Sequence, residues 1–156
     1  MKSAARTPYR IIRQLQPQHI VQLVDLYQGE FWCNTRKQED VLRMLDNTDI
    51  VIGLIDQDDT LCGFCRVLTD YVYKATLYDV IVAPQKRNLG LGDVLMQTLL
   101  ALPELNGIEH IDLSCLQSML PFYRRYGFSD ELAGLLQMRR FHQASQAERQ
   151  NDASSD

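Results

Sequence analysis

The stretch VIVAPQKRNLGLG, residues 80–92, decides the fold. Its β-branched start reads as the end of a strand, because Pro84 cannot donate to a sheet ladder. Apolar residues then recur at helical spacing, which predicts a helix that begins directly after the loop. The first turn of a helix offers N–H groups without internal acceptors, and its dipole is positive there. The stretch therefore predicts a place where a phosphate is stabilised.

The residues of this loop suit such a ligand. Gly90 and Gly92 have no Cβ, so an anion can approach the backbone closely. Asn88 tolerates a positive φ better than most residues do, and Lys86 and Arg87 add positive charge. The alternative is an ordinary strand-to-helix turn with glycines for packing. The third glycine of a dinucleotide fingerprint and the Gly-Lys-Ser/Thr of a P-loop are both missing.

Hydrophobic periodicity extends the prediction along the chain. Strands are expected over 9–15, 49–55, 61–68, 77–83, 108–113 and 135–141, with helices between them that end near Gly29, Pro103 and Gly127. The resulting order, βααβββαβαβ, is typical of an α/β sandwich around one sheet. We expect a single domain over 9–141, a flexible start over 1–8 and a disordered polar tail over 142–156.

Composition limits the classes of function. Hydrophobic residues make up 46% of the 156 residues and charged residues 23%, values typical of globular domains. A net charge of −4 argues against non-specific nucleic-acid binding, which depends on Lys and Arg. The sequence has no apolar run long enough for a membrane span and starts without a secretory signal. These patterns favour a soluble cytoplasmic protein.

Cys62 and Cys65 have the C-x-x-C spacing of some zinc and redox sites. No second C-x-x-C or histidine pair supplies the other ligands that zinc needs. The pair also falls inside an expected strand, where the two side chains point to opposite faces. We therefore interpret the cysteines as buried thiols in a reducing compartment and expect no metal.

Two motifs together resemble a known family. Arg87, Gly90 and Gly92 fill the three defined positions of Arg/Gln-x-x-Gly-x-Gly/Ala, the acyl-CoA loop of GNAT acetyltransferases. The later stretch PFYRRYGF, residues 121–128, resembles the second GNAT motif. The likeness covers nearly the whole chain and is closest to a small, poorly characterised bacterial subset. It implies a central mixed, mostly antiparallel sheet flanked by helices.

The resemblance also implies a cosubstrate, acetyl-CoA. Its pyrophosphate is expected on the loop amides, and its pantetheine arm beside a strand that it pairs with like an extra strand. The residues concerned are Arg87, Asn88, Leu89, Gly90, Leu91 and Gly92 for the loop and Val80, Ile81 and Val82 for the strand. An Asn that many GNAT proteins carry near the CoA arm is replaced by Leu116. Many family members are dimers, so a homodimer is compatible with the resemblance.

Two side chains are candidates for proton transfer. Tyr123 occupies the motif position from which the family often protonates the leaving thiolate, and a phenol stays protonated at neutral pH. Tyr126 ranks second. Asp79, in an apolar strand, is the candidate base, because burial raises the pKa of a carboxylate. The alternatives are that both tyrosines pack the helix and that Asp79 pairs with Arg66 on the adjacent strand.

The acceptor is expected to be a small-molecule amine such as an arylalkylamine, a polyamine or an amino-acid-like compound. Trp32 and Arg36 lie in the connection that borders the acceptor site in this fold, and Asp70 and Tyr71 leave a hairpin that we expect to line the same site. Trp32 either stacks on the acceptor or covers the core. Two other functions stay open: a non-catalytic acyl-CoA-binding module and a protein-lysine acetyltransferase.

Overall fold

A computed structural model describes residues 8–142. The flexible start and the disordered tail that the sequence predicts lie almost wholly outside these residues. Contacts divide the chain into two compact units, Met1–Leu120 and Pro121–Asp156. The single domain expected over 9–141 stays a prediction.

One five-stranded sheet organises the first unit. Its strands lie in chain order, with antiparallel pairing from the first to the fourth and parallel pairing between the last two. They are β1 (Arg10–Ile12), β2 (Ile50–Ile55), β3 (Leu61–Thr69), β4 (Lys74–Val82) and β5 (His110–Leu113). The α/β class and the mixed, mostly antiparallel sheet are thereby confirmed.

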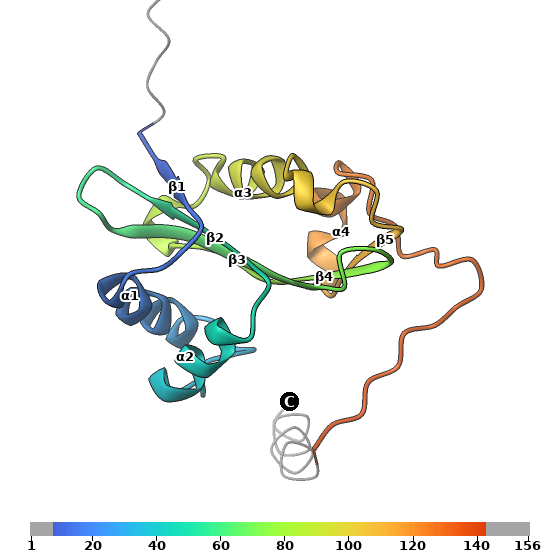
Figure 1. Cartoon of the computed structure of the whole chain (residues 1–156), viewed down its shortest axis with the longest axis horizontal. Helices are drawn as coiled ribbons and strands as arrows, with labels where there is room; N and C mark the ends of the chain where they lie inside the picture. The colour runs from blue at the N-terminus through green and yellow to red at the C-terminus, as the bar shows by residue number, and fades with distance from the viewer. Residues whose placement is uncertain (1–7, 143–156) are drawn as a thin grey trace, which may run out of the picture. The chain divides into compact units, whose positions relative to one another are not determined.

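Three helices cover the sheet from both sides. Figure 1 shows α1 (Pro17–Gln28) and α2 (Gln38–Asp46) on one face and α3 (Leu91–Leu100) on the other. Pro17 suits the first turn of α1, where its missing N–H has no intrahelical acceptor in any case. Because helices cover both faces, β2 is buried along nearly its whole length, as its apolar sequence requires.

The core sits between these layers. Leu23 and Tyr27 of α1 and Val41 of α2 belong to one buried cluster with Phe64 of β3. The Tyr27 and Phe64 rings meet edge to face, with centroids 6.4 Å apart. This contact places the Tyr27 hydroxyl above the sheet, where it requires a hydrogen-bond partner.

The second unit contains little regular structure among its described residues. Helix α4 (Leu120–Arg124) begins at the last residue of the first unit and continues in the second. It is shorter than the helix expected up to residue 126. Gly127 follows with φ +85°, which fits its predicted role after the helix. The strand expected over 135–141 is wrong, because these residues form no strand. Leu136 and Met138 are 90% and 93% exposed, so the apolar residues there do not pack as a strand would.

Candidate active site

The loop after β4 has the conformation that its residues predict. A 3₁₀ turn (Pro84–Lys86) follows β4, and α3 begins at Leu91 with Gly90 as its N-cap. Asn88 has φ +62° and Gly90 φ +79°, so two left-handed residues stand almost side by side at the helix entrance. A Cβ added at Gly90 would meet no atom within 4 Å, so the space in front of this residue is open.

The two cations of the loop already have partners. The Arg87 Nη2 atom lies 2.6 Å from Glu30 Oε1, and its Nε donates to the Val82 carbonyl at 3.2 Å. Lys86 Nζ lies 3.6 Å from an Asp56 oxygen. Arg87 therefore joins the loop to the connection between α1 and α2, and the backbone N–H groups of the loop are further donors for an anion.

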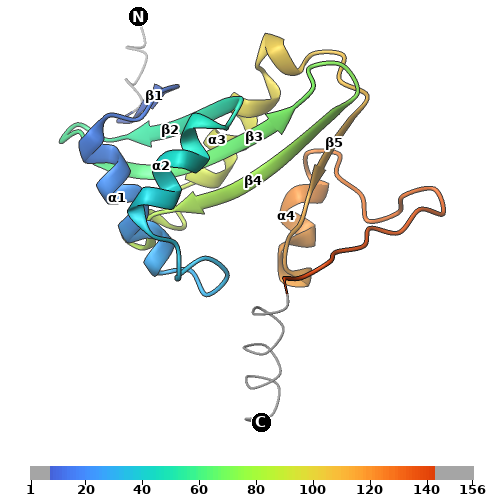
Figure 2. The same ribbon diagram turned by 60° about the horizontal axis from the view of Figure 1, so that its bottom comes forward.

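The strand before the loop has an edge without a strand partner. Pairing of β4 with β5 runs from Lys74–His110 to Leu77–Leu113 and stops there, although β4 continues to Val82. Figure 2 shows the two strands diverging beyond this point. The register of β3 against β4 also shifts between the Phe64 and Arg66 pairs, which marks a bulge in β4. Asp79 lies in this bulge with φ +55°.

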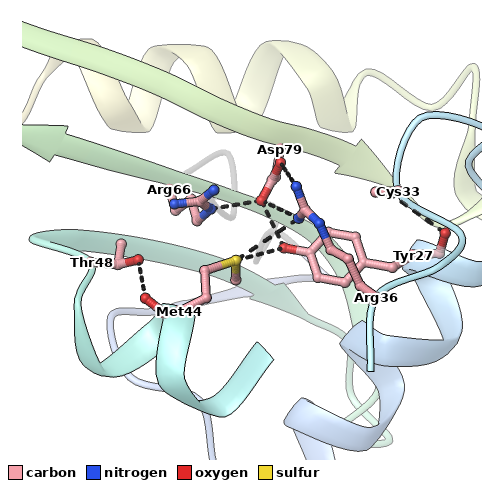
Figure 3. A network of polar contacts seen from close by, with 7 residues as sticks. All are labelled: Tyr27, Cys33, Arg36, Met44, Thr48, Arg66 and Asp79. Atoms are coloured by element: carbon pink, nitrogen blue, oxygen red, sulfur yellow. Dashed lines mark hydrogen bonds and ion pairs between the residues drawn. The ribbon is translucent and has the colours of Figure 1, made fainter. Parts of the chain in front are cut away.

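Asp79 is the centre of a buried polar cluster (Figure 3). Its Oδ2 atom accepts hydrogen bonds from Arg66 Nε at 2.6 Å, from Arg36 Nη1 at 2.8 Å and from the Tyr27 hydroxyl at 2.8 Å. Arg36 Nη2 reaches the other carboxylate oxygen at 3.3 Å. Residues from α1, the α1–α2 connection, β3 and β4 thus converge on one carboxylate. We call Tyr27, Arg36, Arg66 and Asp79 the Asp79 cluster.

The environment of Asp79 is the opposite of what a general base requires. Burial alone raises the pKa of its carboxyl, but hydrogen bonds and charge from Arg36 and Arg66 outweigh burial and lower the pKa below its usual range. The expectation of a raised pKa is therefore wrong, and the alternative, pairing with Arg66, is what the structure shows. Burial, followed by the charge of Asp79, raises the pKa of Tyr27, which keeps its hydroxyl protonated.

Of the four candidate acceptor residues, Trp32 and Arg36 lie beside each other, and Asp70 and Tyr71 lie in another turn. Arg36 stacks over Tyr27, with 4.5 Å from its guanidinium carbon to the ring centroid, and lies 5.8 Å from the Trp32 ring. Asp70 and Tyr71 stand in the β3–β4 turn, before β4 begins at Lys74. With a rise of about 3.3 Å per residue, Lys74 lies about 16 Å along β4 from Asp79. The prediction that both segments line one site stays a prediction.

Asp70 has a structural role in its turn. One carboxylate oxygen accepts hydrogen bonds from the backbone N–H groups of Val72, Tyr73 and Lys74. These bonds to the charged form lower the pKa of Asp70. Tyr71, with φ +62°, is one of the turn residues that this carboxylate encloses. The hydrogen bonds to the Asp70 carboxylate stabilise the turn between β3 and β4.

In the second unit, Tyr123 is buried among aromatic rings. Its ring centroid lies 5.0 Å from that of Phe122 and 6.0 Å from that of Phe128, both edge to face. Tyr126 lies 5.5 Å from Phe122 in the same cluster. These contacts hold the Tyr123 side chain in one orientation, and its proton-donor role stays a prediction.

The cysteines lead to a direct expectation. Cys33, Cys62 and Cys65 are buried, whereas Cys115 is exposed. Burial raises the pKa of Cys33 to about 11 and that of Cys65 to about 12. Brief alkylation at neutral pH should therefore label Cys115 first, with mass spectrometry as the readout, because the thiolate is the reactive form. Rapid labelling that persists in Cys115→Ser would contradict the buried positions of the other three thiols.

Between residues 8 and 142, no group of three or more His, Cys, Asp or Glu side chains is placed to hold a metal ion. The same part of the chain contains no helix that is both long and apolar enough to span a bilayer.

Comparison with known proteins assigns the family. Residues 18–128 match the model of the Acetyltransferase (GNAT) family. The chain belongs to the GNAT acetyltransferases. It is therefore an acyltransferase, and the family generally uses acetyl-CoA.

Two relatives of this GNAT enzyme are named as N-acetyltransferases. It is 32% identical over 120 residues to the uncharacterised N-acetyltransferase ycf52 of Porphyra purpurea, covering 72% of this chain and 69% of that protein. It is 34% identical over 98 residues to serotonin N-acetyltransferase 2, chloroplastic, of Oryza sativa subsp. japonica, covering 60% of this chain and 49% of the rice protein.

Solved structures agree with this assignment. A GNAT-family protein from Xanthomonas campestris pv. campestris is 28% identical with a TM-score of 0.75, covering 86% of this GNAT chain and 93% of the other. A protein from Deinococcus radiodurans R1, described as an acetyltransferase, is 29% identical with a TM-score of 0.68, covering 90% and 92%. The family assignment therefore rests on sequence and on fold together.

Sequence reasoning missed how the Asp79 cluster assembles. It paired Asp79 with Arg66 as an alternative, but it gave Tyr27 no polar role and treated Arg36 as a substrate contact. The available signal was Tyr27 itself, because a buried tyrosine on an apolar stripe requires a partner for its hydroxyl. Which carboxylate it meets depends on tertiary packing between segments 52 residues apart.

Proposed function

We propose that this enzyme transfers an acetyl group from acetyl-CoA directly to an amine of a small molecule. The observation that carries the proposal is the loop from Arg87 to Gly92, where two left-handed residues precede the first turn of α3. Successive backbone N–H groups in such a turn form a concave binding site for anions. The loop therefore fits the pyrophosphate of a coenzyme A.

Two further features of the chain suit the rest of that molecule. The open space in front of Gly90 is what a phosphate at the backbone needs, since a Cβ would project into it. The edge of β4 beyond Leu77 has no strand partner among the described residues. Its peptide groups at Val80, Ile81 and Val82 are suited to pair with the amides of the pantetheine arm, although Arg87 already occupies the Val82 carbonyl.

The reaction needs a neutral amine, a reactive acyl group and a protonated leaving group. Acetyl-CoA supplies the thioester, and the amine nitrogen bonds to its carbonyl carbon as the carbon–sulfur bond breaks. Tyr123 is our candidate to give its proton to the departing sulfur. The ammonium proton of the acceptor leaves to water before attack, because Asp79 is held ionised in its ion pairs and is a weak base. The second proton, which the nitrogen loses as the amide forms, also leaves to water, and the Tyr123 phenolate regains a proton from water. In this proposal Asp79 is a positioning residue for the bulge.

A pair of glycines offers a matched test. Gly90 and Gly107 both have φ +79°, and a Cβ on either meets no atom within 4 Å. Gly90→Ala and Gly107→Ala should therefore lose similar stability, about 1 kcal/mol each, from the strained backbone. Only Gly90→Ala should raise the KM for acetyl-CoA. We expect an increase of about tenfold, the effect of losing one hydrogen bond to a charged phosphate group.

The assay measures thiol release with acetyl-CoA and a panel of amines, and calorimetry measures CoA binding. Equal KM values in both glycine variants would show that the loop does not hold the cosubstrate. CoA binding without turnover on any small amine would favour a non-catalytic acyl-CoA-binding module. Turnover only on intact proteins would favour a protein-lysine acetyltransferase.

The proposal extends to the setting of the enzyme. Cys33, Cys62 and Cys65 lie buried as thiols rather than in disulfides. This pattern supports a reducing compartment such as the cytoplasm.

A further inference from the structure

The Asp79 cluster carries more positive than negative charge. Two guanidinium groups, Arg36 and Arg66, share the single carboxylate of Asp79. Burial keeps the neighbouring Tyr27 hydroxyl protonated by raising its pKa, so it adds no negative charge. Burial likewise raises the pKa of the Cys33 thiol to about 11, so it is neutral at physiological pH. The cluster therefore has a net charge of about +1 near neutral pH.

The other carboxylates near the α1–α2 connection do not balance this charge. Glu30 pairs with Arg87, and Asp40 on α2 pairs with Arg43. Among the residues from 8 to 142, Arg36 and Arg66 have an ion pair with Asp79 and with no other acid. A buried charge without a counter-ion is costly, because the interior solvates it poorly. The surplus positive charge therefore favours the binding of an anion at the Asp79 cluster.

The guanidinium groups still have donors to offer. An arginine carries five N–H groups, and Arg66 uses its Nε on Asp79 while its two Nη groups have no hydrogen-bond partner among the described residues. The Arg66 side chain is 10% exposed, and its guanidinium carbon lies 4.7 Å from the Tyr78 ring centroid. Arg36 uses one hydrogen on each Nη for Asp79, and its side chain is 29% exposed beside Trp32. Figure 3 shows both forks gathered around the same carboxylate.

The cluster lies where an acceptor would arrive. Asp79 is in the bulge of β4, directly before Val80, at the strand edge that we assign to the pantetheine arm. Arg36 comes from the connection between α1 and α2. An amine that reaches this bulge brings its other substituents next to the two guanidinium groups.

We propose that the acceptor is an amine that also carries a carboxylate, as an amino acid does, and that Arg66 and Arg36 recognise this carboxylate. The inference rests on the proposed function, since it names the acceptor of that same site. A carboxylate accepts two parallel N–H bonds from a guanidinium, which provides geometric specificity as well as attraction. A polyamine would bring a second positive charge to a cluster that already has a surplus, so it is disfavoured.

Matched pairs of amines test the acceptor class. Tryptophan is compared with tryptamine, phenylalanine with phenethylamine, and ornithine with putrescine, by thiol release at saturating acetyl-CoA. We expect the carboxylate-bearing member of each pair to have a kcat/KM about 10- to 100-fold higher, the range of one hydrogen bond between charged groups. The difference should lie mainly in KM.

Two variants identify the residues responsible. Arg66→Lys keeps the positive charge but loses the fork, so it should lower kcat/KM for the carboxylate-bearing member of each pair more than for the decarboxylated member and reduce the preference for the carboxylate by about tenfold. Arg43→Lys is the matched control, because Arg43 pairs with Asp40 on the exposed face of α2. A general loss of structure in Arg66→Lys would slow both members of each pair and lower the melting temperature.

A measurement on the parent enzyme covers the case in which Arg66→Lys fails to fold. N-Acetyltryptophan should inhibit more strongly than N-acetyltryptamine, because only the former presents a carboxylate to the cluster. Equal or stronger use of the amines that lack a carboxylate would overturn the inference while leaving the N-acetyltransferase intact. If acetyl-CoA fails to bind the parent, the proposed function and this inference fall together.

Discussion

Asp79→Asn is expected to lower the free energy of unfolding by about 3 kcal/mol, the lower end of the loss seen when one partner of a buried ion pair is removed. Asn has nearly the same shape and tolerates the φ of +55° that Asp79 adopts, so the backbone of the bulge is preserved. The change leaves Arg36 and Arg66 without their common counter-ion. Denaturant unfolding followed by circular dichroism measures the loss.

The matched control is Asp40→Asn. Asp40 also pairs with an arginine, but that pair lies on the surface, with side-chain exposures of 53% and 78%. Exposed pairs contribute little because water and salt screen them. Similar stabilities for the two variants would show that the Asp79 cluster adds no more than an exposed pair does.

The same ion pairs give the stability a dependence on pH. The pKa of Asp79 is lower in the folded protein than its usual value near 3.8, so its charged form is stabilised by folding. That contribution is complete above the unfolded pKa, about 4, and is lost as the pH falls through the folded pKa. The parent should therefore lose more stability on acidification below about pH 4 than Asp79→Asn does.

The second large effect is expected for Tyr123→Phe. If the phenol protonates the departing sulfur, its removal should lower kcat by about 100-fold, the lower end of the range for general acid catalysis. The KM for acetyl-CoA should change little, because in the proposed binding mode the loop amides, and not Tyr123, bind the pyrophosphate. Phenylalanine keeps the ring and its edge-to-face contacts with Phe122 and Phe128, so the fold is preserved.

Tyr126→Phe is the control for this effect. Tyr126 belongs to the same aromatic cluster and lies three positions further along the chain. It should retain nearly full activity. Equal activity of the Tyr123→Phe enzyme and the parent across the whole pH range would remove the acid role. A rise of activity with pH that is lost in Tyr123→Phe would point to the opposite protonation state of the phenol.

The parts of this enzyme that the sequence could predict are those set by neighbouring residues. The left-handed Asn88 and Gly90 and the start of α3 follow from local backbone preferences and from hydrophobic spacing. The strand over 135–141 was predicted by the same kind of pattern and is absent. Alternation identifies residues that can form a strand, but an adjacent strand has to be present to pair with them.

The electrostatic state of Asp79 depends on residues that are distant in the chain. Its carboxylate meets Tyr27 and Arg36, which are 52 and 43 positions away. From the sequence alone, burial is the visible influence and implies a raised pKa. The guanidinium groups of Arg36 and Arg66 reverse the direction of the shift, so the pKa of Asp79 is lowered. The bulge that places Asp79 between them appears only when the register of β3 and β4 is known.

The stacking of Arg36 beside Trp32 gives the protein an optical reporter of its own. Trp32 is the only tryptophan in the chain, so all indole fluorescence comes from the connection that also carries Glu30 and Arg36. Trp32 is 43% exposed, and its ring lies 5.8 Å from the Arg36 guanidinium carbon. Emission from this indole is therefore a label-free signal for events at the Asp79 cluster, and it requires no engineered dye.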